Sequence, residues 1–234
     1  MNSITQDRLQ LLANGYTPIR NHDKRTFMKE WPSLEIDEAE VRRWERMTRD
    51  KATGIRIEDG LAAIDFDIND KAAMTAIANA VFDRIDRLGD PDAALLVRTG
   101  KGAKEAWFVR TDEEFGRIHS RSWTRPGEGL DAGTHRVEVF GGASPRQFGA
   151  LGPHTVSDDG VPEIMYAWPE RSPLDTGKHE LPELTKAEFF AIADIVEEVL
   201  AGLGWHLVET SKKGENNAVR VYDLTEDMQF DLNT

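Results

Sequence analysis

The most informative stretch of this sequence is Leu61-Ala62-Ala63-Ile64-Asp65-Phe66-Asp67. Residues two apart in a β-strand point to the same side, so Asp65 and Asp67 project together, away from an apolar side that faces a core. Two adjacent carboxylates repel each other, and keeping both ionised against a buried sheet is costly unless a cation lies between them. The pattern favours a site for Mg²⁺ or Mn²⁺. The plain alternative is two acids on a solvated strand face.

A third acidic residue lies in another strand-like stretch, Arg136-Val137-Glu138-Val139-Phe140. Alternation puts Glu138 on the face of Arg136, opposite the two valines. If this strand neighbours the first one, Glu138 completes a cluster of three carboxylates, which is the arrangement that supports two-metal phosphoryl transfer. The alternative is an Arg–Glu pair on an edge strand.

A glycine-containing turn follows a further strand-like stretch and reads Arg98-Thr99-Gly100-Lys101-Gly102-Ala103-Lys104-Glu105. Its glycines permit a close backbone approach, and its three basic side chains could meet a triphosphate. The turn is not a P-loop, because Gly102 stands where Ser or Thr would follow the lysine.

Read in order, short motifs of this chain resemble the N-terminal domain of bifunctional DNA primase/polymerases (prim-pol). These proteins belong to the archaeo-eukaryotic primase superfamily and occur in phage and plasmid replication. The resemblance covers roughly residues 14–168 and rests on Gly15-Tyr16-Thr17-Pro18 with Lys24, Lys29 and Trp31, on Gly54-Ile55-Arg56-Ile57, on Ile64-Asp65-Phe66-Asp67, on Arg98-Thr99-Gly100-Lys101-Gly102, on Val137-Glu138-Val139-Phe140, on Arg146-Gln147-Phe148, on Gly152-Pro153-His154 and on Tyr166-Ala167-Trp168.

The resemblance implies a nucleotidyltransferase in which two divalent cations, Mg²⁺ or Mn²⁺, position an incoming nucleotide and a 3′-hydroxyl. Carried over to this chain, the catalytic residues and metal ligands are Asp65, Asp67 and Glu138. The implied partners are nucleoside triphosphates and a DNA template and primer, and a helicase domain in the same or a partner chain is common in such proteins. No membrane partner is expected.

Four basic residues are expected, from charge and position, to contact the triphosphate or the template. They are Lys101, Lys104, Arg146 and His154. The chain also departs from the family, because the second motif of prim-pol proteins ends in a histidine that contacts the nucleotide phosphates and the matching residue here is Glu105. A carboxylate beside a triphosphate is repulsive, so Glu105 predicts weakened or altered catalysis.

The pattern of apolar and turn residues predicts an α+β fold. Helices are expected from residue 3 to 14, from 37 to 47, from 71 to 88 and from 185 to 203. Strands are expected at 16–19, 54–57 and 61–68 (joined as a hairpin), 95–98 and 106–109 (around a turn), 136–140, 147–151 and 166–168, with helix and loop at 111–129. The resemblance implies an RRM-like, antiparallel-containing sheet as catalytic core. We expect a prim-pol domain at 1–170 that includes a smaller N-terminal α/β module, a proline-containing linker at 171–183, and a helical tail at 184–234 that begins a further region of a longer protein.

Composition excludes several classes of protein. The 234 residues contain no cysteine, which excludes disulfide scaffolds, thiolate metal sites and a cysteine nucleophile. The N-terminus lacks the order of a signal peptide and no apolar run could span a bilayer, so a cytoplasmic protein of a bacterial or phage-infected cell is expected. The net charge is −13, yet residues 98–146 carry nine basic and seven acidic side chains. A phosphate-binding surface is therefore expected in the middle of the chain.

The function expected from these observations is addition of nucleoside triphosphates to a nucleic acid 3′ end during phage, plasmid or prophage replication. Two alternatives stay open. One is a catalytically weakened prim-pol-like module that binds DNA or nucleotide, suggested by Glu105 and the acidic composition. The other is a metal-dependent nuclease that uses the same acids, although the acid-x-Lys pattern of restriction-type nucleases is absent after Glu138.

Overall fold

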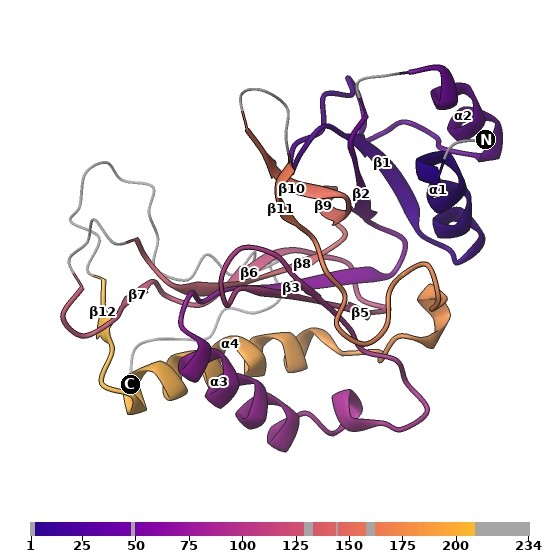
Figure 1. Cartoon of the computed structure of the whole chain (residues 1–234). Coiled ribbons are helices and arrows are strands. Elements are labelled where there is room, and N and C mark those ends of the chain that lie inside the picture. The colour runs from indigo at the N-terminus through magenta and orange to yellow at the C-terminus, as the bar shows by residue number, and fades with distance from the viewer. Residues whose placement is uncertain (1–2, 48–49, 129–132, 144, 158–161, 209–234) are drawn as a thin grey trace.

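The computed structural model describes residues 3–47, 50–128, 133–143, 145–157 and 162–208. Within these ranges the fold is α+β, with antiparallel sheets and four α-helices, which confirms the predicted fold class at that level. Figure 1 shows a central sheet with two helices on one side and a smaller sheet with its own helices on the other. Of the helices in this part of the chain, none combines the length and the apolar character that a membrane span requires.

The central sheet has five antiparallel strands in the order β4-β5-β3-β8-β6. The middle strand, β3 (Leu61–Asp67), lies between β5 (Glu105–Arg110) and β8 (Arg136–Gly141). The edges are β4 (Leu96–Thr99) and β6 (Phe115–His119). The predicted pairing around the turn after Thr99 is confirmed, because β4 and β5 are hydrogen-bonded neighbours.

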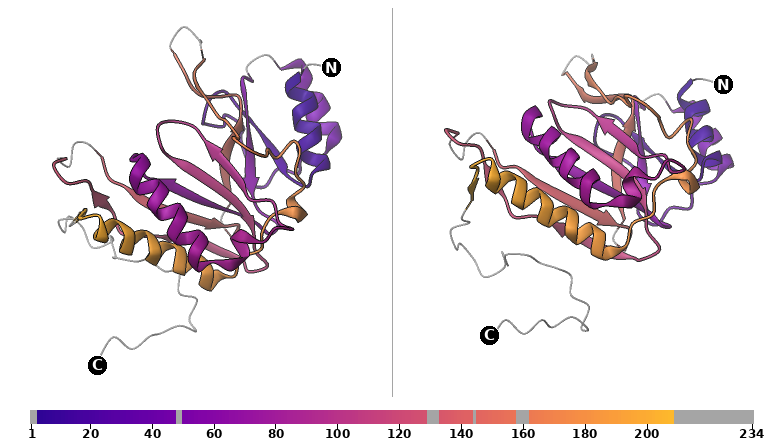
Figure 2. Two further views of the ribbon diagram at one scale, coloured as in Figure 1. Left: turned by 60° about the horizontal axis from the view of Figure 1, so that its bottom comes forward. Right: turned by 90° about the horizontal axis from the view of Figure 1, so that it is seen from below.

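Two long helices cover one face of this sheet, α3 (Lys71–Arg84) and α4 (Lys186–Gly202) (Figure 2). α4 begins with a capping box, since Thr185 and Glu188 bond to each other's backbone N–H groups. α3 is shorter than predicted and gives way to a short 3₁₀ helix, η2 (Asp86–Gly89). The core between helices and sheet includes Ile64, Phe66, Ile77, Trp107, Val139 and Phe189.

A three-stranded sheet packs against the other face of the central sheet. Its order is β1-β2-β9, formed by β1 (Thr17–Asn21), β2 (Ala52–Ile57) and β9 (Arg146–Leu151). The second core lies between the two sheets and includes Ile55, Leu61, Ala63, Ala106, Phe108 and Phe148. Burial of both faces of the central sheet explains why β3 is apolar on either side before it reaches its aspartates.

The N-terminal helices complete the smaller layer. They are α1 (Ser3–Ala13) and α2 (Glu38–Arg43), the latter continued by a 3₁₀ turn, η1 (Trp44–Arg46). A buried ion cluster ties this layer together, because the Asp50 carboxylate accepts hydrogen bonds from Arg8 Nη1 at 2.6 Å and from Arg20 Nη2 at 2.8 Å.

The predicted hairpin between residues 54–57 and 61–68 is wrong. Both strands exist, but β2 pairs with β1 and β9 in the small sheet, whereas β3 pairs with β5 and β8 in the central sheet. The intervening turn uses left-handed backbone at Asp59 (φ 51°) and Gly60 (φ 77°). The turn therefore connects the two sheets, and β2 and β3 pair with different strands.

The prediction of helix and loop at 111–129 is also wrong, because this stretch contains β6 and the short β7 (Trp123–Thr124). A register shift between Phe115 and Arg117 interrupts the alternation of β6 and hides it in the sequence. β7 pairs with β12 (His206–Leu207), and β10 (Pro153–Val156) pairs with β11 (Pro162–Met165). The strand predicted at 166–168 is reduced to a single bridge between Ala167 and Thr99.

Residues 171–183, predicted as a linker, lie against both layers: the Lys178 N–H donates to the Asn14 carbonyl and the Arg110 N–H donates to the Pro182 carbonyl. This stretch contains the 3₁₀ turn η4 (Lys178–Glu180). α4, predicted as part of a helical tail, shares one core with α3. Residues 209–234 of the predicted tail lie outside the described residues.

Candidate active site

One row of residues crosses all five strands of the central sheet. Arg98 on β4 pairs with Ala106 on β5, which pairs with Asp65 on β3. On its other side Asp65 lies directly opposite Glu138 on β8, and Glu138 lies opposite His119 on β6. Side chains of directly opposed residues emerge on the same face, with Cβ atoms roughly 5 Å apart. The row therefore runs from a guanidinium through two carboxylates to an imidazole.

Asp67 lies on the same face as Asp65, two residues further along β3. Leu61 and Ala63, which precede them on this face, are buried between the two sheets. The carboxylates therefore lie where the face continues beyond the inter-sheet core, and both are only partly exposed. The predicted separation of the aspartates from Ile64 and Phe66 is confirmed, because these two pack on the helical side.

The carboxylate of Asp65 is held in an unfavourable environment. Burial is the main cause that raises its pKa from 3.8 to about 6, with additional repulsion from Asp67 and Glu138. The positive charges of Arg98 and Lys104 act in the opposite direction. Within the described part of the chain, Asp65 makes no side-chain hydrogen bond or ion pair. It is a buried acid without a direct counter-ion, which is a common property of functional carboxylates.

The other two acids each have a basic partner. Asp67 forms an ion pair with Lys104 at the end of the β4–β5 turn. Glu138 Oε1 lies 3.2 Å from Arg117 Nε and 3.2 Å from Arg136 Nη2, and its side chain is only 14% exposed. The Arg136–Glu138 pair therefore exists, but on an inner strand next to β3 and not on the edge strand of the alternative prediction.

Arg98 connects the row to the small sheet. Its Nη1 donates to the Gly149 carbonyl on β9 at 2.6 Å, and its guanidinium lies 4.7 Å from the centre of the Tyr166 ring. Burial lowers the pKa of Arg98, while the negative charge of Asp65 acts against this shift. Its buried Nε has no hydrogen-bond partner among the described residues. Arg98 is therefore a fixed positive charge that faces the unpaired acid across the small side chain of Ala106.

His154 lies near Arg98 and two lysines. The pKa of His154 is lowered, first by burial and then by the charges of Lys24, Arg98 and Lys101. The His154 ring meets the Tyr166 ring edge-on, with centroids 5.3 Å apart. The structure thus brings Lys101 and His154, both predicted as nucleotide contacts, into one positively charged neighbourhood next to the acids.

Arg146 and Glu105 take different positions. Arg146 is exposed at the start of β9, and its guanidinium lies 5.4 Å from the centre of the Phe140 ring, two residues along β8 from Glu138. Glu105 lies opposite Phe66, on the helical face of the sheet, where it accepts a hydrogen bond from Trp107 Nε1 at 2.8 Å. The register therefore points Glu105 away from the face of the carboxylates, which does not support its predicted role as a phosphate neighbour.

The donors on this face suit a hard divalent cation in kind. They are carboxylate oxygens, and Asp65 has no competing partner in the described ranges. In this structure the carboxylates do not form a complete metal site. Among the residues that the structure describes, no group of three acidic or imidazole side chains is placed to hold a metal ion. Asp67 and Glu138 are turned toward Lys104, Arg117 and Arg136 instead. A cation would have to exchange with these ion pairs.

Two contributors to the site were not predicted from the sequence. Arg117 and Tyr166 come from segments that were expected to be helix and loop or a closing strand. Alternation within the stretch 115–119 could have suggested that Arg117 and His119 share a face. Only the pairing of β6 with β8 brings them to Glu138, and that pairing leaves no local signal.

In comparisons with known proteins, no family model and no curated sequence matched this chain. The function is therefore inferred from the geometry of the site.

Proposed function

We propose that the protein is a metal-dependent nucleotidyltransferase of the DNA primase/polymerase kind, acting in the cytoplasm during phage, plasmid or prophage replication. The observation that carries this proposal is the direct pairing of Asp65 with Glu138, with Asp67 on the same face. These three acids are separated by up to 73 positions in the chain, and the fold brings them to one surface. Three carboxylates on one face of a sheet are the ligand type that two-metal phosphoryl transfer uses.

The architecture agrees with an RRM-like catalytic core. An antiparallel sheet carries two helices on one face, and on the other face, next to the small sheet, the acids lie on the inner strands β3 and β8. This arrangement supports the core fold that the prim-pol resemblance implies.

Each residue of the site would have a separate role in the reaction. Asp65, Asp67 and Glu138 would hold Mg²⁺ or Mn²⁺, and these cations would supply the positive charge that stabilises the attacking and leaving oxygens. Lys101 and His154 would bind the triphosphate, and Arg98 would favour the ionised form of Asp65 from the other end of the row. Lys104, released from Asp67, could turn to a phosphate oxygen. Holding the reactants in line is the main contribution of such side chains.

One observation favours a second function, a catalytically weakened module that binds DNA or nucleotide. Asp67 and Glu138 each form ion pairs with basic side chains, so two of the three acids have charge partners without a metal. The register of Glu105 removes one earlier argument for this reading, because that carboxylate faces Trp107.

The test is primer extension with a 5′-labelled primer on a longer template, all four dNTPs, and Mg²⁺ or Mn²⁺. We expect the parental protein to lengthen the primer and the variants Asp65→Asn, Asp67→Asn and Glu138→Gln to lose at least about 100-fold in rate. Asp83→Asn, which changes an exposed acid on α3, is the matched control and should extend at the parental rate. DNA binding without extension would favour the weakened module, and shortening of the primer would favour a nuclease.

A further inference from the structure

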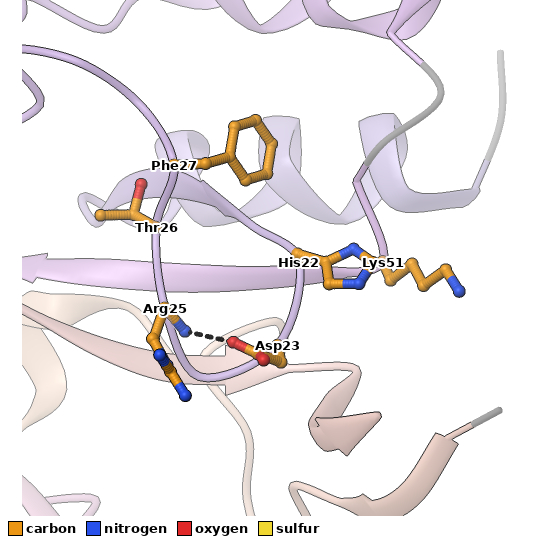
Figure 3. Close-up of a pocket in the computed structure, with 6 residues that line it drawn as sticks. All are labelled: His22, Asp23, Arg25, Thr26, Phe27 and Lys51. Atoms are coloured by element: carbon orange, nitrogen blue, oxygen red, sulfur yellow. Dashed lines mark hydrogen bonds between the residues drawn. The ribbon is translucent and has the colours of Figure 1, made fainter. Parts of the chain in front are cut away.

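A pocket with a volume of about 400 Å³ opens in the N-terminal layer, outside the row of acids. Most of its lining comes from the loop that follows β1, and one residue precedes β2. The lining residues are His22, Asp23, Arg25, Thr26, Phe27 and Lys51 (Figure 3).

The loop that forms this pocket is held in place. The Asp23 carboxylate accepts a hydrogen bond from the Arg25 N–H at 2.8 Å (Figure 3). The Thr26 hydroxyl donates to the Arg20 carbonyl at 3.0 Å. The loop is also tied to the neighbouring strands, since the Lys24 carbonyl accepts from Gln147 Nε2 at 2.7 Å. The lining side chains therefore project from a fixed backbone.

An aromatic ring lies partly in solvent at this pocket. Phe27 is 36% exposed, and the guanidinium of Arg20 lies 5.0 Å from its ring centre. Arg20 is held by three hydrogen bonds to the buried carboxylate of Asp50, two from its Nε and one from its Nη2. A supported aromatic ring with an exposed surface is what the stacking of a nucleobase requires.

The charges around the ring are positive, although the whole chain carries −13. Arg25 and Lys51 line the pocket and both are exposed, whereas Asp23 is the one acid among the lining residues that the structure describes. Lys24, in the same loop, is close enough to His154 to affect its pKa, and His154 is similarly affected by Lys101. Positive charge therefore extends from the pocket to the neighbourhood of the acids. A local group of basic side chains allows a protein with a negative net charge to bind a polyanion.

We propose that this pocket binds single-stranded nucleic acid, with one base stacked on Phe27 and the adjacent phosphates held by Arg25 and Lys51. An exposed ring with flanking cations fits a single strand, whose bases are free to stack, better than a duplex, whose bases are already stacked. This binding site does not depend on catalysis by the acids. In a nucleotidyltransferase it would guide a strand toward the row of carboxylates.

The test is fluorescence anisotropy with a fluorescein-labelled 20-nucleotide oligothymidylate and, in parallel, the matching oligouridylate, without divalent ions. We expect Phe27→Leu, which keeps apolar volume but removes the ring, to bind roughly 5- to 100-fold more weakly, and Phe27→Trp to bind like the parental protein. Arg25→Glu and Lys51→Glu should weaken binding and reduce its dependence on salt. The relative affinity for the two oligomers tells whether DNA or RNA is preferred.

Two controls separate this inference from the proposed function. Lys186→Glu makes the same charge change at the start of α4, on the other side of the central sheet, and should leave binding unchanged. Asp65→Asn should also retain binding even if it abolishes extension. The inference is overturned if the loop variants bind the oligomers like the parental protein, if a duplex of equal length binds equally well, or if thymidine monophosphate competes at the same concentration as the oligomer.

Discussion

Asp65 and Glu138 lie directly opposite each other on neighbouring antiparallel strands, β3 and β8. Like charges in this position destabilise a sheet. The protein offsets the repulsion unequally: Glu138 is paired with Arg117 and Arg136, while Asp65 has a raised pKa and no direct partner among the described residues. This arrangement costs free energy, which the proposed cation would offset. The predictions below follow from this cost.

Neutralising Asp65 should stabilise the metal-free protein in a pH-dependent way. The folded state holds the pKa of Asp65 at about 6, above its ordinary 3.8, so ionising this group costs folding free energy. That cost is absent well below pH 4, grows up to pH 6 and is constant above it. We expect the stability advantage of Asp65→Asn over the parental protein to grow by about 1–3 kcal/mol between pH 4 and pH 7. Urea denaturation in EDTA measures it, and an advantage that does not change with pH would contradict the assignment.

Arg98 should act on the site through Asp65. Its charge lowers the pKa of Asp65, so Arg98→Met is expected to raise that pKa by about one unit. The pH at which Mn²⁺ affinity reaches half its maximum should move upward with it, because the metal binds the ionised carboxylate. Arg98→Lys, which keeps the charge, should restore most of the parental midpoint. An unchanged midpoint in Arg98→Met would show that Arg98 only packs between the sheets.

Lys104 should compete with the proposed cation for Asp67. Since Lys104 pairs with Asp67 in the metal-free protein, Lys104→Met is expected to increase the affinity for Mn²⁺ by about three- to tenfold. The same variant should raise KM for nucleoside triphosphates if Lys104 turns to a phosphate. Calorimetry and steady-state kinetics measure the two effects separately. Weaker Mn²⁺ binding in Lys104→Met would contradict the exchange.

Glu105 should have a structural role and no effect on nucleotide binding. Its carboxylate accepts the Trp107 indole N–H on the helical face, so Glu105→Ala is expected to cost about 1–2 kcal/mol of stability. KM for nucleotides should stay at the parental value in this variant and in Glu105→His. A clear fall in KM for Glu105→His would show that residue 105 reaches the phosphates after all.

Sequence reasoning predicted the parts of this molecule that depend on local periodicity. The alternation around Asp65 gave the correct face for both aspartates, and the helix expected at 185–203 is present as α4. The closeness of Glu138 to Asp65 was a conditional prediction, because nothing in residues 136–140 specifies the neighbouring strand.

The errors came from long-range pairing. An apolar run, a tight turn and a second apolar run are typical of a hairpin, yet β2 and β3 belong to different sheets. The proline-containing stretch 171–183 has the composition of a linker, but its backbone bonds to Asn14 and Arg110 across the fold. Composition reports the local preference of a segment and not the surface that it covers.

The central claim is that Asp65, Asp67 and Glu138 act as one cation site, and a Mn²⁺ titration followed by electron paramagnetic resonance tests it most directly. At pH 7.5 the parental protein should bind Mn²⁺, each of Asp65→Asn, Asp67→Asn and Glu138→Gln should weaken binding at least about tenfold, and Asp83→Asn should not. Absence of Mn²⁺ binding, or equal affinity in the parental protein and all three site variants, would contradict the claim.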